Sequence, residues 1–334
     1  MMPLLRVEGL SVGIRRNRKY LPAVENISFK IMPGEIVGIV GESGCGKSLT
    51  ALSIPGLLPQ GVELTGGGVI FDGRDIRGLS ERELCRIRGN EISMVFQEPM
   101  TSLNPLLRIG AQIAEPLKLH GWKNRKLIGD EVMDIMNKVG LRSPEKLIHE
   151  YPHQLSGGMR QRVMIALAIV CKPKLLIADE PATALDVTIQ AQILRLMKRI
   201  NRDLGTSILF ISHDLGVINR ICDRVLVMYS GRLVEEGTVR NIFFHPVHEY
   251  TRGLMGSIPV RERKGQALVN IPGKVPSIEE KGEAHFAGCP FAPRCVRAED
   301  RCFAAFPKAI PLGENHSVRC ILVDPESEME YVRI

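Results

Sequence analysis

The chain has 334 residues, which is long enough for one large domain with an appendage or for two domains. Its formal net charge is only +7, just 5% of its residues are aromatic, and no dense basic block occurs, so nucleic-acid binding is not expected. The sequence has neither the apolar run of a signal peptide nor the roughly 20 apolar residues of a membrane span, so we expect a cytoplasmic protein.

The first half of the chain predicts strands followed by a helical stretch. Residues 4–14 and 24–31 alternate apolar and polar side chains, which is typical of half-buried strands. Residues 35–40 form an apolar run that predicts a buried strand, and residues 66–73 predict a turn and a further strand. Helical periodicity then runs from about residue 109 to residue 139.

The second half alternates strands with helices. Residues 175–178, 207–211 and 224–228 predict buried strands, and residues 187–202 predict a long amphipathic helix. This order predicts an α/β fold with a mostly parallel sheet covered by helices. The regular rhythm ends near residue 240, after which a surface tail rich in proline, glycine and charge is expected.

A glycine-rich loop follows the predicted strand 35–40. Residues 41–48 match the P-loop pattern GxxxxGK[ST] and open an apolar helix predicted over residues 49–58. The backbone N–H groups of such a loop point at phosphate oxygens, and the helix N-terminus adds positive partial charge. Lys47 is expected to reach the β- and γ-phosphates of ATP, and Ser48 to hold Mg²⁺. The expected ATP-binding residues here are Gly41, Ser43, Gly44, Cys45, Gly46, Lys47, Ser48 and Leu49.

Two carboxylates end the apolar strand that follows Lys174. Ligands of open α/β sheets bind at the carboxyl edge of the strands, where Asp179 and Glu180 are expected to lie. Asp179 is placed to bind Mg²⁺, directly or through water. Glu180 is placed to orient and polarise the attacking water, so we expect it to be the catalytic base.

Three motifs in this order resemble those of ATP-binding-cassette (ABC) ATPases. They are the P-loop at 41–48, the sequence Leu-Ser-Gly-Gly-Met-Arg-Gln-Arg at 155–162, and the strand with its carboxylates at 174–180. The resemblance covers roughly residues 4–240. It implies a P-loop NTPase fold, namely an ABC nucleotide-binding domain with a RecA-like parallel-sheet core, an antiparallel β subdomain and an inserted helical subdomain.

The resemblance also implies domain boundaries. An ABC ATPase domain is expected over residues 1–240, with the helical subdomain at about 100–170. Residues 241–334 are expected to form a small, irregular, cysteine-rich C-terminal extension.

Residues 155–162 resemble the ABC signature sequence, which in the family binds the γ-phosphate of a nucleotide held by the opposite subunit. The resemblance assigns this contact in trans to Ser156, Gly157, Gly158 and Gln161. Because these residues open a helix, their N–H groups and the helix dipole favour an anion. Helix capping by Ser156 would explain the serine but not the two glycines. The chain is therefore expected to need a neighbour to complete an active site.

Smaller motifs resemble further ABC elements. Gln97 resembles the glutamine that senses Mg²⁺ and the γ-phosphate, and with Ser48 and Asp179 it is an expected Mg²⁺ contact. His213 resembles the switch histidine, which contacts the γ-phosphate and holds the catalytic glutamate and water in line. Together with Lys47 and Glu180, these two residues make up the expected catalytic set.

Two further matches have structural alternatives. Asp186 ends a segment that resembles the D-loop, which lines the dimer interface, and it can also cap the following helix. Tyr20 resembles the aromatic residue that stacks on adenine, but it can instead pack on the β layer.

Four cysteines gather in the C-terminal tail. Cys289, Cys295, Cys302 and Cys320 are spaced C-x5-C-x6-C-x17-C, which in a cytoplasmic protein favours thiolate ligation of a metal. Spacing does not decide between Cys₄ zinc and an iron–sulfur cluster, and free thiols or disulfides also remain open.

The tail and the segment around Gln97 resemble the ATPases of oligopeptide and dipeptide importers. The matching stretches are residues 96–105, 248–252, 257–259, 271–273 and 288–295. The resemblance implies a [4Fe–4S] cluster rather than Zn²⁺ on the four cysteines. Its role in the family resembles a structural one, and a redox-sensing role is the alternative. The resemblance also implies uptake of di- and oligopeptides.

The partners implied by this resemblance are two membrane-spanning permease subunits and a second, homologous ATPase. An extracytoplasmic peptide-binding protein would act indirectly. The chain would sit peripherally on the cytoplasmic face of the cell membrane.

Rival functions remain open. Similar ATPases serve nickel and other peptide-like solutes, and a soluble ABC ATPase that moves no solute, such as an accessory protein of a phosphonate-cleaving complex, resembles this family closely. A binding module with a degenerate catalytic site is the third alternative. The intact Lys47, Ser48, Asp179, Glu180 and His213 argue against that one.

Overall fold

The computed structural model describes residues 2–97, 102–183, 186–258, 270–281, 287–313 and 315–324. The chain divides into two compact units, each assembled from separate segments. Unit 1 comprises Met1–Leu4, Ile31–Glu35 and Gly78–Ile211, and unit 2 comprises Leu5–Lys30, Ile36–Arg77 and Ser212–Ile334. Within the described ranges, no helix is both long enough and apolar enough to cross a bilayer.

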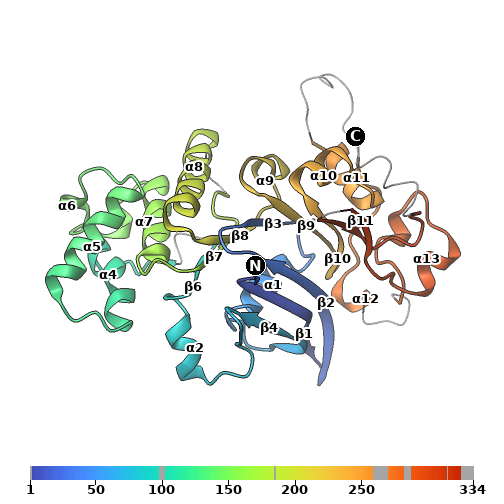
Figure 1. Ribbon diagram of the computed structural model, residues 1–334, viewed down its shortest axis with the longest axis horizontal. Coiled ribbons are helices and arrows are strands. Elements are labelled where there is room, and N and C mark those ends of the chain that lie inside the picture. The colour runs from blue at the N-terminus through green and yellow to red at the C-terminus, as the bar shows by residue number, and fades with distance from the viewer. Residues whose placement is uncertain are drawn as a thin grey trace. The chain divides into compact units, whose positions relative to one another are not determined.

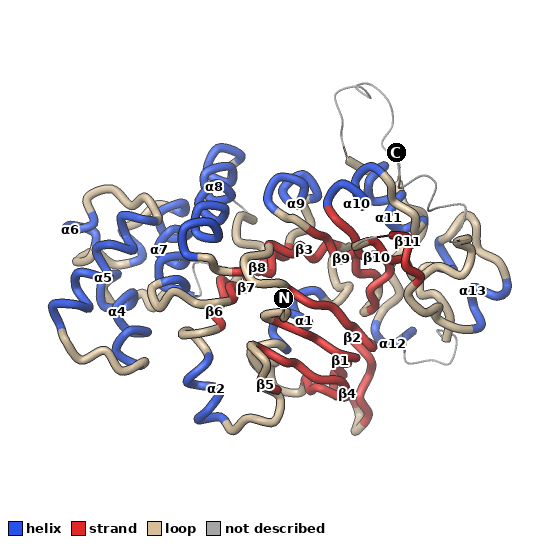
Figure 2. The backbone as a smooth tube through the Cα atoms, in the orientation of Figure 1, coloured by secondary structure: helices blue, strands red, loops and turns tan. Residues whose placement is uncertain are grey.

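An antiparallel sheet forms one part of unit 2 (Figure 2). Its strand order is β2-β1-β4-β5, and β1 pairs with β4 so that Leu5 lies opposite Phe71. The alternation that predicts half-buried strands is present, since Leu5 and Val7 are buried while Arg6 and Glu8 are exposed. The strands are β1 Leu5–Arg16, β2 Lys19–Ile31, β4 Val62–Phe71 and β5 Arg74–Asp75.

A second run of strands in unit 2 has the order β11-β12-β10-β9-β3. Strands β3 and β9 are parallel, whereas β10 pairs antiparallel with both β9 and β12. The strands are β3 Ile36–Val40, β9 Arg224–Tyr229, β10 Arg232–Thr238, β11 Ile310–Gly313 and β12 His316–Val318. The helices of this unit are α1 Lys47–Ser53, α9 Leu215–Ile221, α10 Val239–Phe244, α11 Glu249–Gly256, α12 Ile278–Lys281, the 3-10 turn Ala292–Arg294 and α13 Asp300–Ala304.

Unit 1 contains three parallel strands in the order β8-β7-β6, together with several helices (Figure 1). All five residues of β7 are buried, as are all five of β8, which explains their nearly continuous apolar sequence. Helices α4, α5, α6 and α7 pack together as a helical group. The elements are α2 Glu81–Ile87, β6 Ile92–Val95, α4 Ile109–Leu119, α5 Arg125–Lys138, α6 Pro144–Leu147, the 3-10 turn Pro152–Gln154, α7 Gly157–Ile169, β7 Leu175–Asp179, α8 Val187–Leu204 and β8 Ser207–Ile211.

The structure corrects the prediction at several elements. Helix α1 ends at Ser53 rather than at residue 58, since Pro55 lacks an N–H donor and Gly56 has a left-handed backbone. Strand β2 begins at Lys19, five residues before the predicted start. The mostly parallel sheet with an added antiparallel layer and a helical insertion is otherwise present.

The C-terminal extension is less irregular than predicted. Helices α10 and α11 follow β10 directly, and strands β11 and β12 continue the strand order of unit 2. These strands have only four and three residues, which is too short for a periodic pattern to be visible in the sequence. A domain boundary at residue 240 therefore stays a prediction.

Three hairpins of unit 2 turn through a pair of left-handed residues, and in two of them the second residue is glycine. Between β9 and β10 these are Ser230 and Gly231, with φ of 50° and 84°; between β4 and β5 they are Asp72 and Gly73, with φ of 48° and 76°. Two positive φ angles are typical of tight two-residue hairpin turns. A Cβ on Gly231 would lie 2.4 Å from the Ala23 carbonyl oxygen, whereas a Cβ on Gly73 would meet no atom within 4 Å.

We therefore predict that Gly231→Ala destabilises the protein more than Gly73→Ala. Both variants place alanine at positive φ, which costs about 1–2 kcal/mol. Gly231→Ala adds a clash with fixed backbone, which costs about 1–3 kcal/mol more. Urea unfolding of the two purified variants measures the difference, and equal midpoints would contradict the close approach of Gly231 and Ala23.

Candidate functional site

The glycine-rich loop of unit 2 connects β3 to α1 and passes close to β9. A Cβ on Gly41 would lie 2.2 Å from the carbonyl oxygen of Met228, so only glycine fits at the start of the loop. Ser43 and Gly44 at its tip are exposed, while Cys45 is buried beneath it. Gly46 is the N-cap of α1, so the helix begins directly at the end of the loop.

Lys47 is the first residue of α1, and its ammonium group reaches back across the loop. The Nζ atom donates to the Gly41 carbonyl at 2.8 Å and to the Glu42 carbonyl at 3.1 Å. The side chain is buried at 6% exposure, so the charge is held in a fixed place. Ser48 and Leu49 follow in the same helical turn and are partly exposed. This geometry is suited to a cation that exchanges carbonyl partners for phosphate oxygens.

Tyr20 lies near the start of β2 in the same unit and is 40% exposed. A hydrogen bond with Glu63 of β4 raises the pKa of Tyr20. The ring is therefore fixed at its hydroxyl end while much of its surface stays open. Stacking of this ring on adenine stays a prediction.

In unit 1 the strand β7 delivers two carboxylates, as predicted. Asp179 is buried at the end of the strand, and Glu180 follows with a left-handed backbone at φ 47°. Such a conformation is uncommon for a non-glycine residue and persists only where surrounding bonds fix it. The Glu180 N–H donates to the Ile211 carbonyl at 3.0 Å, and its own carbonyl accepts from the Thr183 N–H at 3.2 Å.

The structure brings Gln97 and Glu180 together across 83 positions of sequence. The Nε2 of Gln97 donates to Oε2 of Glu180 at 3.2 Å. The same oxygen accepts from the Thr183 hydroxyl at 2.9 Å. Two donors thus orient the carboxylate that was expected to polarise water. Thr183 was not predicted, because a single threonine three residues after a glutamate carries no recognisable pattern.

Asp186 caps α8, which confirms its structural alternative. Its carboxylate accepts from the Ile189 N–H at 3.0 Å. The rest of the predicted D-loop, Ala184 and Leu185, lies outside the described residues.

His213 belongs to unit 2, where its side chain is exposed two residues before α9 begins. Asp214 beside it caps α9 by accepting from the Val217 N–H at 3.2 Å.

The predicted signature residues open α7 in unit 1. Ser156 is the N-cap, and its hydroxyl accepts from the Met159 N–H at 3.4 Å. A Cβ on Gly158 would lie 3.1 Å from Ile189 of α8, so close packing between α7 and α8 explains a glycine at this position. A Cβ on Gly157 would meet nothing within 4 Å, so its backbone lies open to an approaching anion.

Gln161 differs from the other predicted signature residues because it is buried. Its side chain is 2% exposed, and its Nε2 has no hydrogen-bond partner within the described part of the chain. Contact between Gln161 and a nucleotide of another subunit would require this part of α7 to be uncovered. Such a contact stays a prediction for this residue.

The four tail cysteines lie within electrostatic range of one another. Burial raises the pKa of Cys289 to about 12, with further contributions from Cys320 and Cys295. Burial also raises the pKa of Cys295 and of Cys320, and each of these thiols is influenced by Cys302. Among the residues that the structure describes, however, no group of three or more His, Cys, Asp or Glu side chains is arranged to hold a metal ion. The predicted iron–sulfur or zinc site is not confirmed.

Comparison with known proteins gives matches over nearly the whole chain. Residues 24–183 match the family "ABC transporter", and residues 234–302 match "Oligopeptide/dipeptide transporter, C-terminal region". The oligopeptide transport ATP-binding protein AppD of Bacillus subtilis is 48% identical over 98% of this chain and 98% of its own. The dipeptide transport ATP-binding protein DppD of the same organism is 45% identical over 98% of this chain and 97% of its own.

Solved structures give the same result for the fold. An ATP-binding cassette solved as a dimer in a post-hydrolysis state with ADP and Pi aligns with a TM-score of 0.64 at 28% identity. The alignment covers 71% of this chain and 99% of that one. The similarity therefore extends over the ATP-binding cassette but not over the whole chain.

We predict that Thr183→Val slows ATP hydrolysis about tenfold, because it removes one hydrogen bond to the charged Glu180 carboxylate. Thr183→Ser keeps the hydroxyl and should retain wild-type turnover. Steady-state kcat and ATP affinity measured for both variants check this. Equal loss in the two variants, or a loss confined to ATP affinity, would contradict an orienting role of the hydroxyl.

Proposed function

The chain belongs to the ATP-binding subunits of oligopeptide and dipeptide ABC transporters, and from this premise we propose that its ATP hydrolysis drives import of di- and oligopeptides. The observation that carries the catalytic part is the placement of the Glu180 carboxylate between two donors, Gln97 and Thr183. A carboxylate fixed in this way is suited to accept a proton from, and align, a water molecule that attacks the γ-phosphate.

The nucleotide is held by the phosphate loop in this proposal. Lys47 leaves the Gly41 and Glu42 carbonyls and binds the β- and γ-phosphates, while the loop N–H groups bind their oxygens. Tyr20 stacks on adenine. Because phosphoryl transfer depends on positioning and on charge stabilisation, these contacts supply most of what the reaction needs from this side.

Mg²⁺ fits the oxygen donors that the chain offers to it. Ser48, Gln97 and Asp179 are the proposed contacts, and hydroxyl, amide and carboxylate oxygens are ligands that Mg²⁺ accepts. The ion would neutralise charge on the phosphates. His213 contacts the γ-phosphate and, in the order of motifs typical of this family, acts on the same nucleotide as Glu180.

A neighbouring ATPase subunit completes the site. Ser156, Gly157 and Gly158 present the N-terminus of α7, a helix of 13 residues, with an open backbone at Gly157. An N-terminus of this kind favours an anion such as a γ-phosphate held by the neighbour. Asp186 would lie at the interface between the two subunits.

The proposed complex contains two membrane-spanning permease subunits and a second, homologous ATPase. An extracytoplasmic binding protein delivers the peptide, and this chain lies peripherally on the cytoplasmic face of the membrane. ATP binding closes the ATPase pair and hydrolysis opens it. The pair therefore switches between two conformations, and this switching acts on the permease. Peptides are favoured over nickel or another solute because the described relatives are oligopeptide and dipeptide transport proteins.

The four tail cysteines are the proposed ligands of a [4Fe–4S] cluster, with Zn²⁺ as the alternative. Other cysteines of the set contribute to the raised pKa of Cys289, Cys295 and Cys320, so the thiols lie near one another, and thiols are donors that suit either group. The positions of these thiols do not fit a metal ion or cluster, because no three His, Cys, Asp or Glu side chains among the described residues are placed to hold one. No step of ATP hydrolysis is assigned to this group, whose role would be to cross-link a small tail.

Glu180→Gln should lower ATP hydrolysis about a hundredfold or more in the assembled complex, because the amide cannot accept the proton. ATP binding should be preserved, since the amide keeps the size of the side chain. Hydrolysis and binding of a fluorescent ATP analogue measured on one preparation check both parts. Unchanged hydrolysis would refute Glu180 as the base, and absence of ATP binding by the wild-type chain would refute the whole proposal.

Metal analysis tests the cysteine proposal separately. Protein purified without oxygen should be brown and contain about four irons per chain, and Cys289→Ser should lower the iron content. A colourless protein with about one zinc would instead select the Cys₄ zinc alternative. Protein without either metal would refute metal ligation by these residues.

A further inference from the structure

Glu42, the second residue of the phosphate loop, is held at three of its groups. Its N–H donates to the Tyr250 hydroxyl oxygen at 2.8 Å, and its carbonyl accepts from Lys47 at 3.1 Å. Its carboxylate accepts from Arg294, with Nη1 to Oε2 at 2.6 Å and Nη2 to Oε1 at 3.1 Å. Tyr250 and Arg294 lie 208 and 252 positions further along the chain, in the C-terminal extension.

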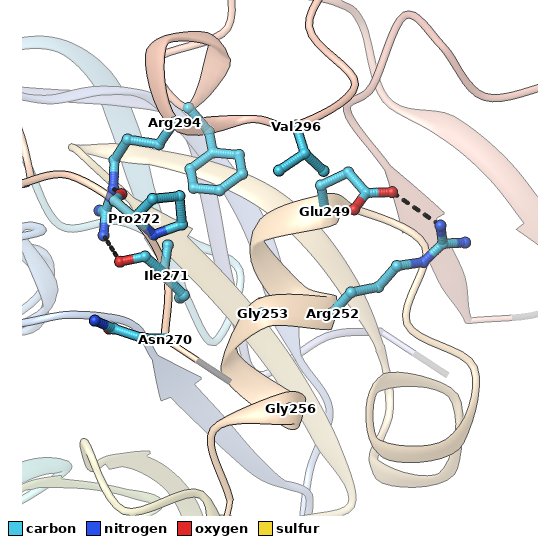
Figure 3. A pocket seen from close by; sticks show the side chains of 10 residues that line it. Glu249, Arg252, Gly253, Gly256, Asn270, Ile271, Pro272, Arg294 and Val296 are labelled. Carbon is cyan, nitrogen blue, oxygen red and sulfur yellow. Dashed lines mark hydrogen bonds and ion pairs between the residues drawn. The ribbon is translucent and has the colours of Figure 1, made fainter. Parts of the chain in front are cut away.

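All three guanidinium nitrogens of Arg294 donate hydrogen bonds. Nη1 also donates to the Tyr229 hydroxyl at 3.1 Å, and Nε donates to the Pro272 carbonyl at 2.6 Å. Nη2 donates to the Ile271 carbonyl at 3.4 Å. Figure 3 shows Arg294 and Ile271 joined on one side of a pocket of about 380 Å³. The hydrogen bond with Glu42 raises the pKa of Arg294, so the guanidinium stays charged.

Three aromatic rings support this ion pair. Tyr229, Tyr250 and Phe291 are 0–3% exposed. The Tyr229 ring lies 4.6 Å from that of Tyr250 and 5.2 Å from that of Phe291, in edge-to-face contacts. The Arg294 guanidinium carbon lies 5.6 Å from the Tyr229 ring centre, within reach of a cation–π contact. Glu42 is thus bound to a packed, buried platform rather than to a mobile surface side chain.

The platform matters most when a nucleotide is bound. In the proposed ATP-bound state Lys47 binds phosphate oxygens in place of the Gly41 and Glu42 carbonyls, so the loop loses the two hydrogen bonds that the ammonium supplies here. The contacts of Glu42 with Tyr250 and Arg294 do not compete with phosphate, and they remain. The loop keeps its shape in the loaded state through these contacts, which leaves the other loop N–H groups free for the anion.

We propose that Arg294 and Tyr250 are positioning residues of the nucleotide site, so that tight ATP binding by this chain requires its C-terminal extension. The proposal rests on the proposed function, because it takes loop 41–48 to be the ATP site. A role in stability alone would lower the amount of folded protein without changing the affinity of the protein that remains folded. A positioning role changes ATP affinity itself.

The test is a double-mutant cycle in the full-length chain. Arg294→Gln and Glu42→Gln each remove the ion pair and should weaken binding of a fluorescent ATP analogue about tenfold to a hundredfold, as expected for lost hydrogen bonds between charged groups. The double variant should bind about as well as either single variant, because both remove the same interaction. In the assembled complex KM for ATP should rise while kcat at saturating ATP stays unchanged.

Arg301→Gln is the matched control, because Arg301 pairs at 2.8 Å with Glu299 on an exposed part of the same extension. It should bind ATP like the wild type. Tyr250→Phe, which removes only the hydroxyl that accepts from Glu42, should weaken binding in the same direction. Together with Glu42→Gln it provides the test if Arg294→Gln does not fold.

The outcomes separate this inference from the proposed function. Wild-type protein that fails to bind ATP refutes the proposed function. Wild-type protein that binds ATP, with folded Arg294→Gln, Glu42→Gln and Tyr250→Phe proteins of equal affinity, refutes only the positioning role. Losses that add fully in the double variant also contradict it, because they would show that Arg294 and Glu42 act independently.

Discussion

A loop that binds phosphate through its backbone N–H groups must be held in shape by its other groups. Here the Lys47 ammonium satisfies the Gly41 and Glu42 carbonyls, and Gly41 lies against the Met228 carbonyl, where no side chain would fit. The buried Arg294 fixes the Glu42 side chain. Because backbone polar groups left unpaired are costly, this arrangement keeps the loop ordered while leaving its anion-binding groups available.

In unit 1, Glu180 is likewise held in place by the groups around it. Glu180 has an uncommon backbone conformation, and the Ile211 carbonyl and Thr183 N–H hold it there. Its carboxylate is oriented by Gln97 and by the Thr183 hydroxyl. Preorganised groups lower a reaction barrier without reorganising during the reaction. In each unit one of the positioning side chains, Arg294 or Thr183, is not itself a proposed contact of the nucleotide.

The sequence predicted the elements with strong patterns and the motifs that lie in one stretch of chain. The buried strands β3 and β7 have nearly continuous apolar runs, and the amphipathic helix α8 has periodic apolar residues. The loop 41–48 has fixed glycine spacing. It did not predict β11 and β12, which are too short to show a period. It also gave no signal for Thr183, or for Arg294 on Glu42, because such pairs depend on how distant segments fold together. Gln97 was expected near the nucleotide only through family resemblance.

The central claim is that ATP hydrolysis by this chain drives peptide uptake, and transport in proteoliposomes tests it most directly. The complex of both ATPases and the permease would be reconstituted with the binding protein and a labelled dipeptide on the opposite side of the membrane from ATP. The account predicts that the dipeptide is transported to the ATP side only while ATP is hydrolysed, and that the binding protein with peptide stimulates hydrolysis. ATP hydrolysis that is indifferent to peptide, with no transport of di- or oligopeptides, would contradict it.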